Sequence, residues 1–126
     1  MRFALITEGV SEHKMMRHLI EKYFKGHDLG PIRQIQPQLV NDKQRTTGGW
    51  PEVLKYCSRA DDLQQIFIDS DFLIIQIDTD QSQQKPFDVS HTNPNNQVKT
   101  NSELYFEVVG KLKSLIHLEI LGKIWQ

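Results

Sequence analysis

The stretch "RFALITEGVSE", residues 2–12, joins an apolar run to a glycine between two acidic residues. A short run that contains Phe, Leu and Ile and stops at a Glu-Gly pair predicts a buried strand over residues 2–7, followed by a turn. Beyond Val10 the apolar residues recur with helical spacing, which predicts an amphipathic helix. Glu8 and Glu12 therefore flank a junction between a strand and a helix.

A second apolar run, "FLIIQI" at residues 72–77, is followed by Asp78, Thr79 and Asp80. This run is the most hydrophobic strand candidate in the chain, and near-continuous apolar character is typical of strands covered on both faces. We therefore expect it to lie at the centre of a parallel sheet, with the strand over residues 2–7 beside it. Ligands bind beyond the carboxyl ends of such strands in open α/β folds.

Weaker signals indicate the remaining elements. Residues 31–40 alternate loosely in hydrophobicity and predict a strand, which two prolines assign to a sheet edge. Ser11 is the expected N-cap of the first helix, Pro51 fits the first turn of a second, and Thr100 with Glu103 forms a capping-box signature for the last. A further helical or turn segment is expected over residues 61–70.

The alternation of strands and helices predicts one α/β domain over residues 1–126, with a mostly parallel sheet flanked by helices. Residues 81–100 are rich in Gln, Asn, Ser and Pro and predict a long polar loop, mobile because it offers little apolar surface to bury. The apolar end "LEILGKIWQ", residues 118–126, contains no convincing closing strand. We therefore expect either a missing C-terminal region or a partner protein that completes the sheet.

The composition limits the classes of function. Lys and Arg number 15 against 16 Asp and Glu, a formal net charge of −1, so total charge does not indicate a strongly basic nucleic-acid binder. The single cysteine, Cys57, cannot form an internal disulfide, which suits a reducing cytoplasm and a small core residue. No apolar run approaches the roughly 20 residues of a membrane span. We expect a cytoplasmic protein with no membrane partner.

The acidic residues after the two apolar runs predict a metal site. If the strands are neighbours, Glu8, Asp78 and Asp80 converge at one edge of the sheet, and Glu12 lies one helical turn further on. Carboxylates at close range repel each other, and oxygen ligands on an open rim suit Mg²⁺ or Mn²⁺ better than zinc. Gly9 would allow a tight turn and leave room for a phosphate. Each motif also has a purely structural interpretation: a simple turn, a partner for the helix dipole, or loop chemistry.

Together, "LITEGVSE" and "FLIIQIDTD" resemble the two motifs of the TOPRIM domain, a Rossmann-like α/β fold. The form is most similar to that of OLD-family and small TOPRIM-type nucleases, over roughly residues 2–80. The resemblance implies that Glu8, Glu12, Asp78 and Asp80 are metal ligands. It also implies catalytic roles for Glu8, Asp78 and Asp80, with Glu8 as a general acid or base. A further ligand and a lysine of those nucleases have only nominees here: Lys85, Asp88, Lys99 and Glu103.

The resemblance implies a metal-dependent nuclease that hydrolyses phosphodiester bonds of DNA or RNA, in anti-phage defence or RNA processing. One alternative is a haloacid-dehalogenase-like phosphatase with Asp78 as nucleophile, which leaves Glu8 unexplained. Another is a non-catalytic TOPRIM-like interaction domain. His13 is a candidate phosphate contact. Arg45 and the Gly48–Gly49 pair could meet a nucleic-acid backbone, although a surface loop is the favoured interpretation.

Overall fold

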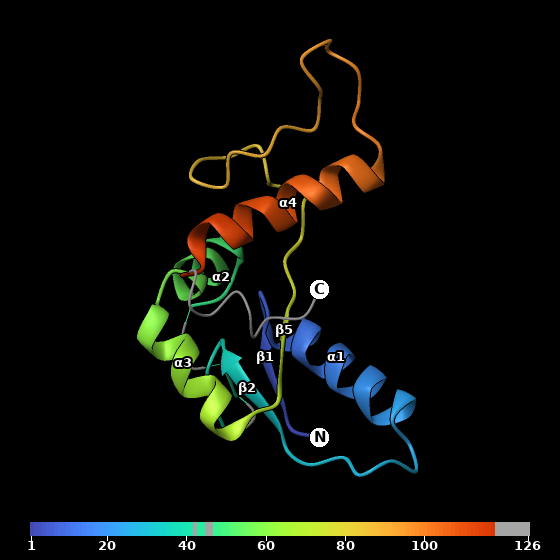
Figure 1. The fold of residues 1–126 in the computed structure, drawn as a ribbon, viewed down its shortest axis with the longest axis vertical. Coiled ribbons are helices and arrows are strands. Elements are labelled where there is room, and N and C mark those ends of the chain that lie inside the picture. Colours follow the sequence, from blue (N-terminus) through green and yellow to red (C-terminus); the bar gives the residue numbers. More distant parts are fainter. Residues whose placement is uncertain (42, 45–46, 118–126) are drawn as a thin grey trace.

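The computed structural model describes residues 1–41, 43–44 and 47–117 (Figure 1). Three strands form a parallel sheet in the order β2 (Ile32–Gln36), β1 (Phe3–Ile6) and β5 (Phe72–Ile75). Phe3 lies opposite both Ile32 and Phe72 in the register of the two strand pairs. The predicted α/β class, a parallel sheet flanked by helices, is confirmed.

The central strand of the sheet is β1. All four of its residues are buried, whereas Phe72 on β5 is 39% exposed and no described strand pairs with the outer edge of β5. The prediction that the run at residues 72–77 is central is therefore wrong. Helices can cover both faces of an edge strand while its backbone edge stays open, so an apolar run does not by itself identify the central strand. β2, which lies between Pro31 and Pro37, is at the opposite edge of the sheet, as predicted.

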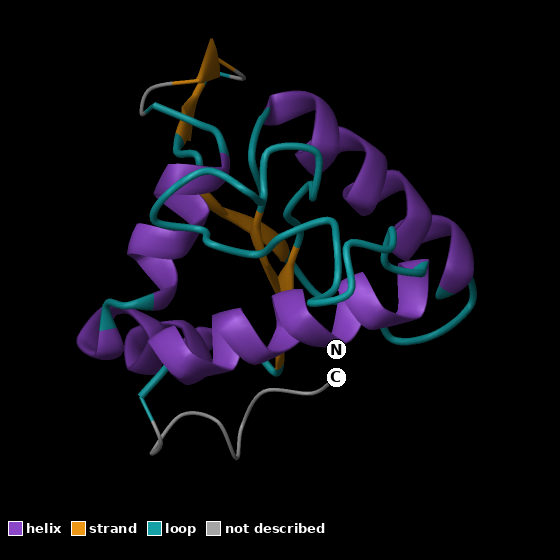
Figure 2. Ribbon diagram, turned by 90° about the horizontal axis from the view of Figure 1, so that it is seen from above, coloured by secondary structure: helices purple, strands orange, loops and turns teal. Residues whose placement is uncertain are grey.

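Helices cover both faces of the sheet. Figures 1 and 2 show α1 (Val10–Tyr23) on one face, α2 (Trp50–Cys57) and α3 (Ala60–Asp69) on the other, and α4 (Asn101–Leu115) across the carboxyl ends of the strands. Side chains alternate along β1, so Phe3 and Leu5 pack towards Ile20 of α1, whereas Ala4 and Ile6 belong to the core beneath α2 and α3. The sheet is thus covered on both faces, as its apolar strands require.

The helix starts differ in how well the sequence predicts them. Gly9 caps α1 without a side-chain hydrogen bond, so the predicted N-cap Ser11 lies inside the helix. The expected capping box of α4 is present, because the Glu103 N–H donates to Thr100 Oγ1 at 3.2 Å. Pro51 occupies the first turn of α2, as predicted.

The segment between β5 and α4 is anchored to the protein by apolar side chains. Phe87 is fully buried and Val89 is 5% exposed, and both pack with Leu54 and Val108. The Phe87 and Trp50 ring centroids are 5.5 Å apart. The premise that the loop has little apolar surface to bury is therefore wrong for its first half.

A separate two-stranded hairpin, β3 (Leu39–Val40) with β4 (Lys43–Gln44), follows β2. In the part of the chain that the structure describes, we find no helix with the length and apolar character needed to cross a membrane. Cys57 lies in the core, and burial raises the pKa of its thiol to about 12. Its predicted role as a small core residue is confirmed.

Candidate active site

The turn after β1 is held by hydrogen bonds to neighbouring elements. The buried Thr7 donates its N–H to Gln36 O at 2.8 Å, and its hydroxyl donates to Gly9 O at 2.9 Å. The carbonyl of Glu8 accepts from the Gly49 N–H at 2.7 Å. Glu8 is therefore fixed at the carboxyl end of the central strand, beside the start of α2.

Glu8 and Asp78 are brought together by the parallel arrangement of β1 and β5. The Asp78 side chain and backbone lie close enough to the Glu8 carboxyl to act on its pKa, and Gln76 bonds to both residues. Partial burial raises the pKa of Glu8 to about 7, and the hydrogen bond and charge of Asp78, with a smaller contribution from Asp80, act in the same direction. Glu8 thus holds a proton more tightly than an ordinary glutamate does, beside the carboxyl group of Asp78.

The side chain of Gln76 connects the two halves of this pair. Its Oε1 accepts from the Glu8 N–H at 3.1 Å, and its Nε2 donates to Asp78 Oδ1 at 3.0 Å. Gln76 is not among the residues predicted from the sequence motifs. The available signal was a lone polar residue inside the run "FLIIQI", which is otherwise apolar.

The side chain of Glu12 occupies the space beside Gly9 that was predicted to admit a phosphate. A Cβ at Gly9 would lie 2.8 Å from Glu12 Oε2, so the Glu12 carboxylate is folded back over Gly9. The backbone of Gly9 is extended, with φ −157°, which any residue can adopt. The absence of a Cβ at Gly9 therefore leaves room for the Glu12 carboxylate, and the backbone of the turn itself does not depend on a glycine. Glu12 also lies in the first turn of α1, where a negative charge stabilises the helix dipole.

The four predicted ligands are not assembled as one cluster. Among residues 1–41, 43–44 and 47–117, no three acidic, histidine or cysteine side chains are arranged to hold a single metal ion. Glu8 and Asp78 are in contact, and Asp80 is close enough to raise the pKa of Glu8. Mg²⁺ is commonly held by one or two carboxylates together with waters and substrate phosphates. The chemistry of the Glu8–Asp78 pair therefore fits a magnesium-type ion.

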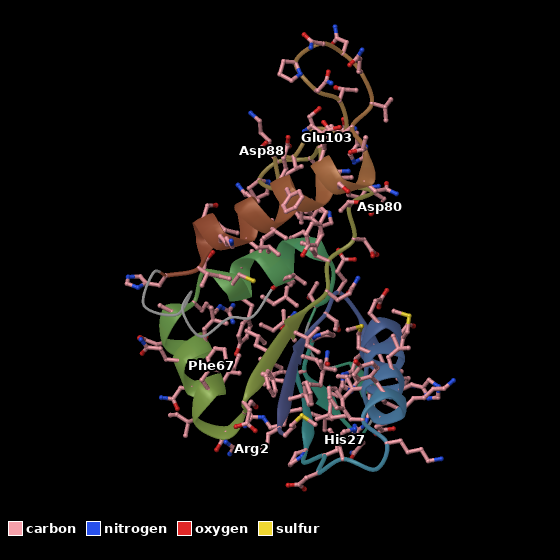
Figure 3. All side chains as sticks on the ribbon, turned by 45° about the vertical axis from the view of Figure 1, so that its right-hand side comes forward. Arg2, His27, Phe67, Asp80, Asp88 and Glu103 are labelled. Carbon is pink, nitrogen blue, oxygen red and sulfur yellow. The ribbon has the colours of Figure 1, made fainter. Side chains whose placement is uncertain are left out.

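The nominated additional residues have other contacts. Glu103 accepts from the Thr100 hydroxyl at 3.0 Å, and the Lys99 ammonium pairs with Glu107 and donates to Ser90 O at 2.7 Å. Glu103 lies in the first turn of α4, and in Figure 3 Asp88 lies on the side of α4 away from the strands. Asp88 and Lys85 are exposed.

The structure differs from the predictions for His13 and Gly49. His13 is 4% exposed, so it presents no surface to a phosphate; burial, with a smaller effect of the Arg17 charge, lowers its pKa. Gly49 is more than part of a surface loop, because its N–H bonds to Glu8. Arg45 lies outside the described residues.

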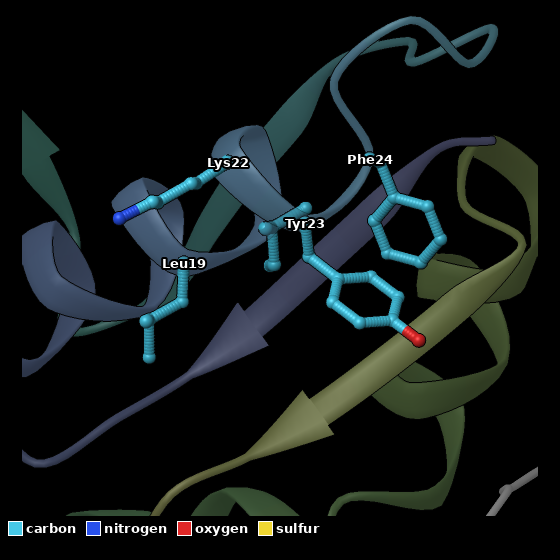
Figure 4. Close-up of a pocket in the computed structure, with 5 residues that line it drawn as sticks. Leu19, Lys22, Tyr23 and Phe24 are labelled. Atoms are coloured by element: carbon cyan, nitrogen blue, oxygen red, sulfur yellow. The ribbon is translucent and has the colours of Figure 1, made fainter.

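An apolar hollow of about 470 Å³ lies on the second half of α1 and is lined by Leu19, Ile20, Lys22, Tyr23 and Phe24 (Figure 4). Glu8 precedes the first residue of this 14-residue helix, whose length is about 21 Å at 1.5 Å per residue. The hollow is therefore separate from the carboxylate pair. Its lining offers one ammonium group and no acid or base suited to hydrolysis.

Comparison of the chain with known proteins yields no match to a family model, to a curated protein or to a solved structure. The TOPRIM assignment therefore stays a prediction that rests on two short motifs. The geometry at the end of β1 and β5 is the evidence that bears on function.

Proposed function

We propose that this chain is a metal-dependent nuclease of the TOPRIM type, with Glu8, Asp78 and Asp80 at its active site. The observation that carries the proposal is the approach of Glu8 to Asp78 at the carboxyl ends of two adjacent parallel strands, where Gln76 bonds to both residues. Neighbouring carboxylates repel each other, and a divalent cation relieves that repulsion. Asp80 and Glu12 are the next acidic groups along the same two segments.

The proposed chemistry divides between an ion and the protein. A bound Mg²⁺ or Mn²⁺ would neutralise charge on a phosphodiester and lower the pKa of a water molecule. Glu8 and Asp78 would hold the ion through their carboxylate oxygens. The resemblance to TOPRIM nucleases also suggests Glu8 as the group that would take a proton from an attacking water and return it to the leaving oxygen. DNA and RNA both offer the phosphodiester that this site requires.

The contact favours this proposal over a haloacid-dehalogenase-like phosphatase. In that alternative Asp78 alone attacks the phosphate, and nothing requires an acidic residue at the end of β1. The proximity of Glu8 to Asp78, with Gln76 bonded to both, gives Glu8 a place in the site.

The test is a titration of the purified protein with Mn²⁺ by calorimetry, followed by cleavage assays on single- and double-stranded DNA and RNA. We expect binding of Mn²⁺ and cleavage of at least one substrate that depends on Mn²⁺ or Mg²⁺. Glu8→Gln should abolish cleavage.

The matched control is Asp69→Asn, because Asp69 is an exposed carboxylate that pairs with Arg33 at 3.0 Å on the far side of the fold. This variant should bind Mn²⁺ and cleave like the parent protein. Mn²⁺ binding without cleavage of any substrate would support the interaction-domain alternative, and absence of Mn²⁺ binding would refute the metal site.

A further inference from the structure

Gln76 is partly buried just beyond the end of β5, and its side-chain amide makes two hydrogen bonds. The chain beyond Ile75 is no longer part of the β5 strand, yet the Gln76 N–H still donates to Ile6 O at 2.8 Å. This bond continues the ladder between β1 and β5 by one residue. It fixes the Gln76 backbone next to the turn that carries Glu8.

The orientation of the Gln76 amide is set by its two partners. The Glu8 N–H can only donate, so it faces Oε1; the Asp78 carboxylate can only accept, so it faces Nε2. An amide is the side chain that satisfies both partners at once. A carboxylate at this position would face Asp78 with a like charge, and an aliphatic side chain would leave both partners without this contact.

We infer that Gln76 is a positioning residue, which holds the Asp78 carboxylate against Glu8 in the orientation that binds the metal ion; this inference rests on the proposed function. Asp78 lies in a segment without regular secondary structure, so its side chain is not oriented by a strand or a helix. The hydrogen bond from Gln76 at 3.0 Å supplies that orientation. Outer partners that orient metal-binding side chains commonly change metal affinity by 10- to 100-fold when they are removed.

Gln76→Leu tests the inference, because leucine has a similar size and makes neither hydrogen bond. We expect Mn²⁺ affinity to fall about tenfold. We also expect the Mn²⁺ concentration for half-maximal cleavage to rise by a similar factor, whereas the rate at saturating Mn²⁺ recovers most of its parent value. A residue with only a structural role would not produce this separation. The amide hydrogen of Glu8 should also exchange faster with solvent, because its acceptor Oε1 is lost.

Gln97→Leu is the matched control. Gln97 is exposed in the segment before α4, and its Oε1 accepts from the Asn93 amide at 3.4 Å. This variant should keep the Mn²⁺ affinity of the parent protein.

The outcomes separate the two proposals. If the parent protein binds no Mn²⁺, the proposed function fails. If the parent binds Mn²⁺ and Gln76→Leu binds it equally well, the role of Gln76 is refuted while the proposed function stands. Equal losses of affinity in both glutamine variants would also refute a specific role for Gln76.

Discussion

At the residue scale, the contact between Glu8 and Asp78 places a like-charged pair at the end of the two strands. Burial, and then the neighbouring Asp78, raise the pKa of Glu8, so the folded protein holds a proton on Glu8 that the unfolded chain releases. Such a pair weakens the metal-free protein and becomes favourable only with a cation bound. The stability of variants therefore distinguishes a metal site from a structural hydrogen bond.

Asp78→Asn should leave the melting temperature of the metal-free protein unchanged or raise it. An asparagine keeps the shape of the side chain, its oxygen can accept from Gln76 Nε2, and its amide can donate to Glu8. The stabilisation by Mn²⁺ should shrink towards zero, because a ligand stabilises the fold only as far as it binds the native state. Thermal melts of both proteins, with and without Mn²⁺, measure these effects. A melting temperature several degrees lower, with the Mn²⁺ shift intact, would show that Asp78 has a structural role.

At the scale of the elements, α4 and the segment before it depend on one aromatic anchor. Phe87 is fully buried against Trp50, Leu54 and Val108, so it connects this segment to α2 and α4. The same segment contacts the residues between Asp78 and Asp80, because His91 Nε2 lies 2.7 Å from the carbonyl oxygen of Thr79. A substitution at Phe87 should therefore also loosen the chain between Asp78 and Asp80.

Phe87→Ala should lower the free energy of unfolding by about 3–5 kcal/mol, the usual cost of removing a buried phenylalanine side chain. Backbone amides of residues 79–91 should exchange faster with solvent. Urea denaturation and hydrogen exchange measure the two effects. Val98→Ala is the control, because Val98 is 81% exposed in the same segment and its removal should change neither quantity. Equal effects of the two substitutions would contradict the role of Phe87 as the anchor.

Local signals predicted most of the elements, and tertiary packing decided the rest. The capping box at Thr100 and Glu103 was predictable because it involves residues one helical turn apart. The order of the strands was not, because the runs that begin at Phe3 and Phe72 are similarly apolar and their positions depend on the connections between them. The burial of Phe87 was missed because its partners are on other helices.

The candidate site shows the same division. The approach of Glu8 to Asp78 follows from two parallel neighbouring strands, which the sequence pattern predicts. The position of Glu12 over Gly9 depends on a side-chain conformation that spacing does not specify. The bridge made by Gln76 was visible only as a polar residue in an apolar run.

At the scale of the whole molecule, three groups give the stability of the fold its dependence on pH. The pKa of Glu8 is raised, chiefly by burial, so its contribution falls as pH rises. Burial lowers the pKa of His13, so its contribution is lost as pH falls below the ordinary histidine range. The hydrogen bond from Arg2 lowers the pKa of Asp71, and that contribution is lost only in acid, below the usual aspartate value. Glu8 and His13 thus oppose each other over the same interval.

A comparison with Glu8→Gln isolates the contribution of Glu8. Between its ordinary value of 4.5 and about 7, the folded protein holds a proton on Glu8 that the unfolded chain has released. The free energy of unfolding of the parent, relative to the variant, should therefore fall across this interval and level off above it. We expect a fall of about 1–2 kcal/mol, less than the full pKa shift would give because the carboxyl is only partly buried. Urea denaturation at a series of pH values without metal measures this difference.

The same measurement with Mn²⁺ tests whether the proton and the ion compete for one site. Mn²⁺ binding requires the ionised carboxylates, so the stabilisation that it gives the parent should grow as pH rises through the pKa of Glu8 near 7. Glu8→Gln should show little stabilisation at any pH. A difference between parent and variant that stays flat over the whole interval, together with an effect of Mn²⁺ independent of pH, would show that the pKa of Glu8 is not raised and that Glu8 is not a metal ligand.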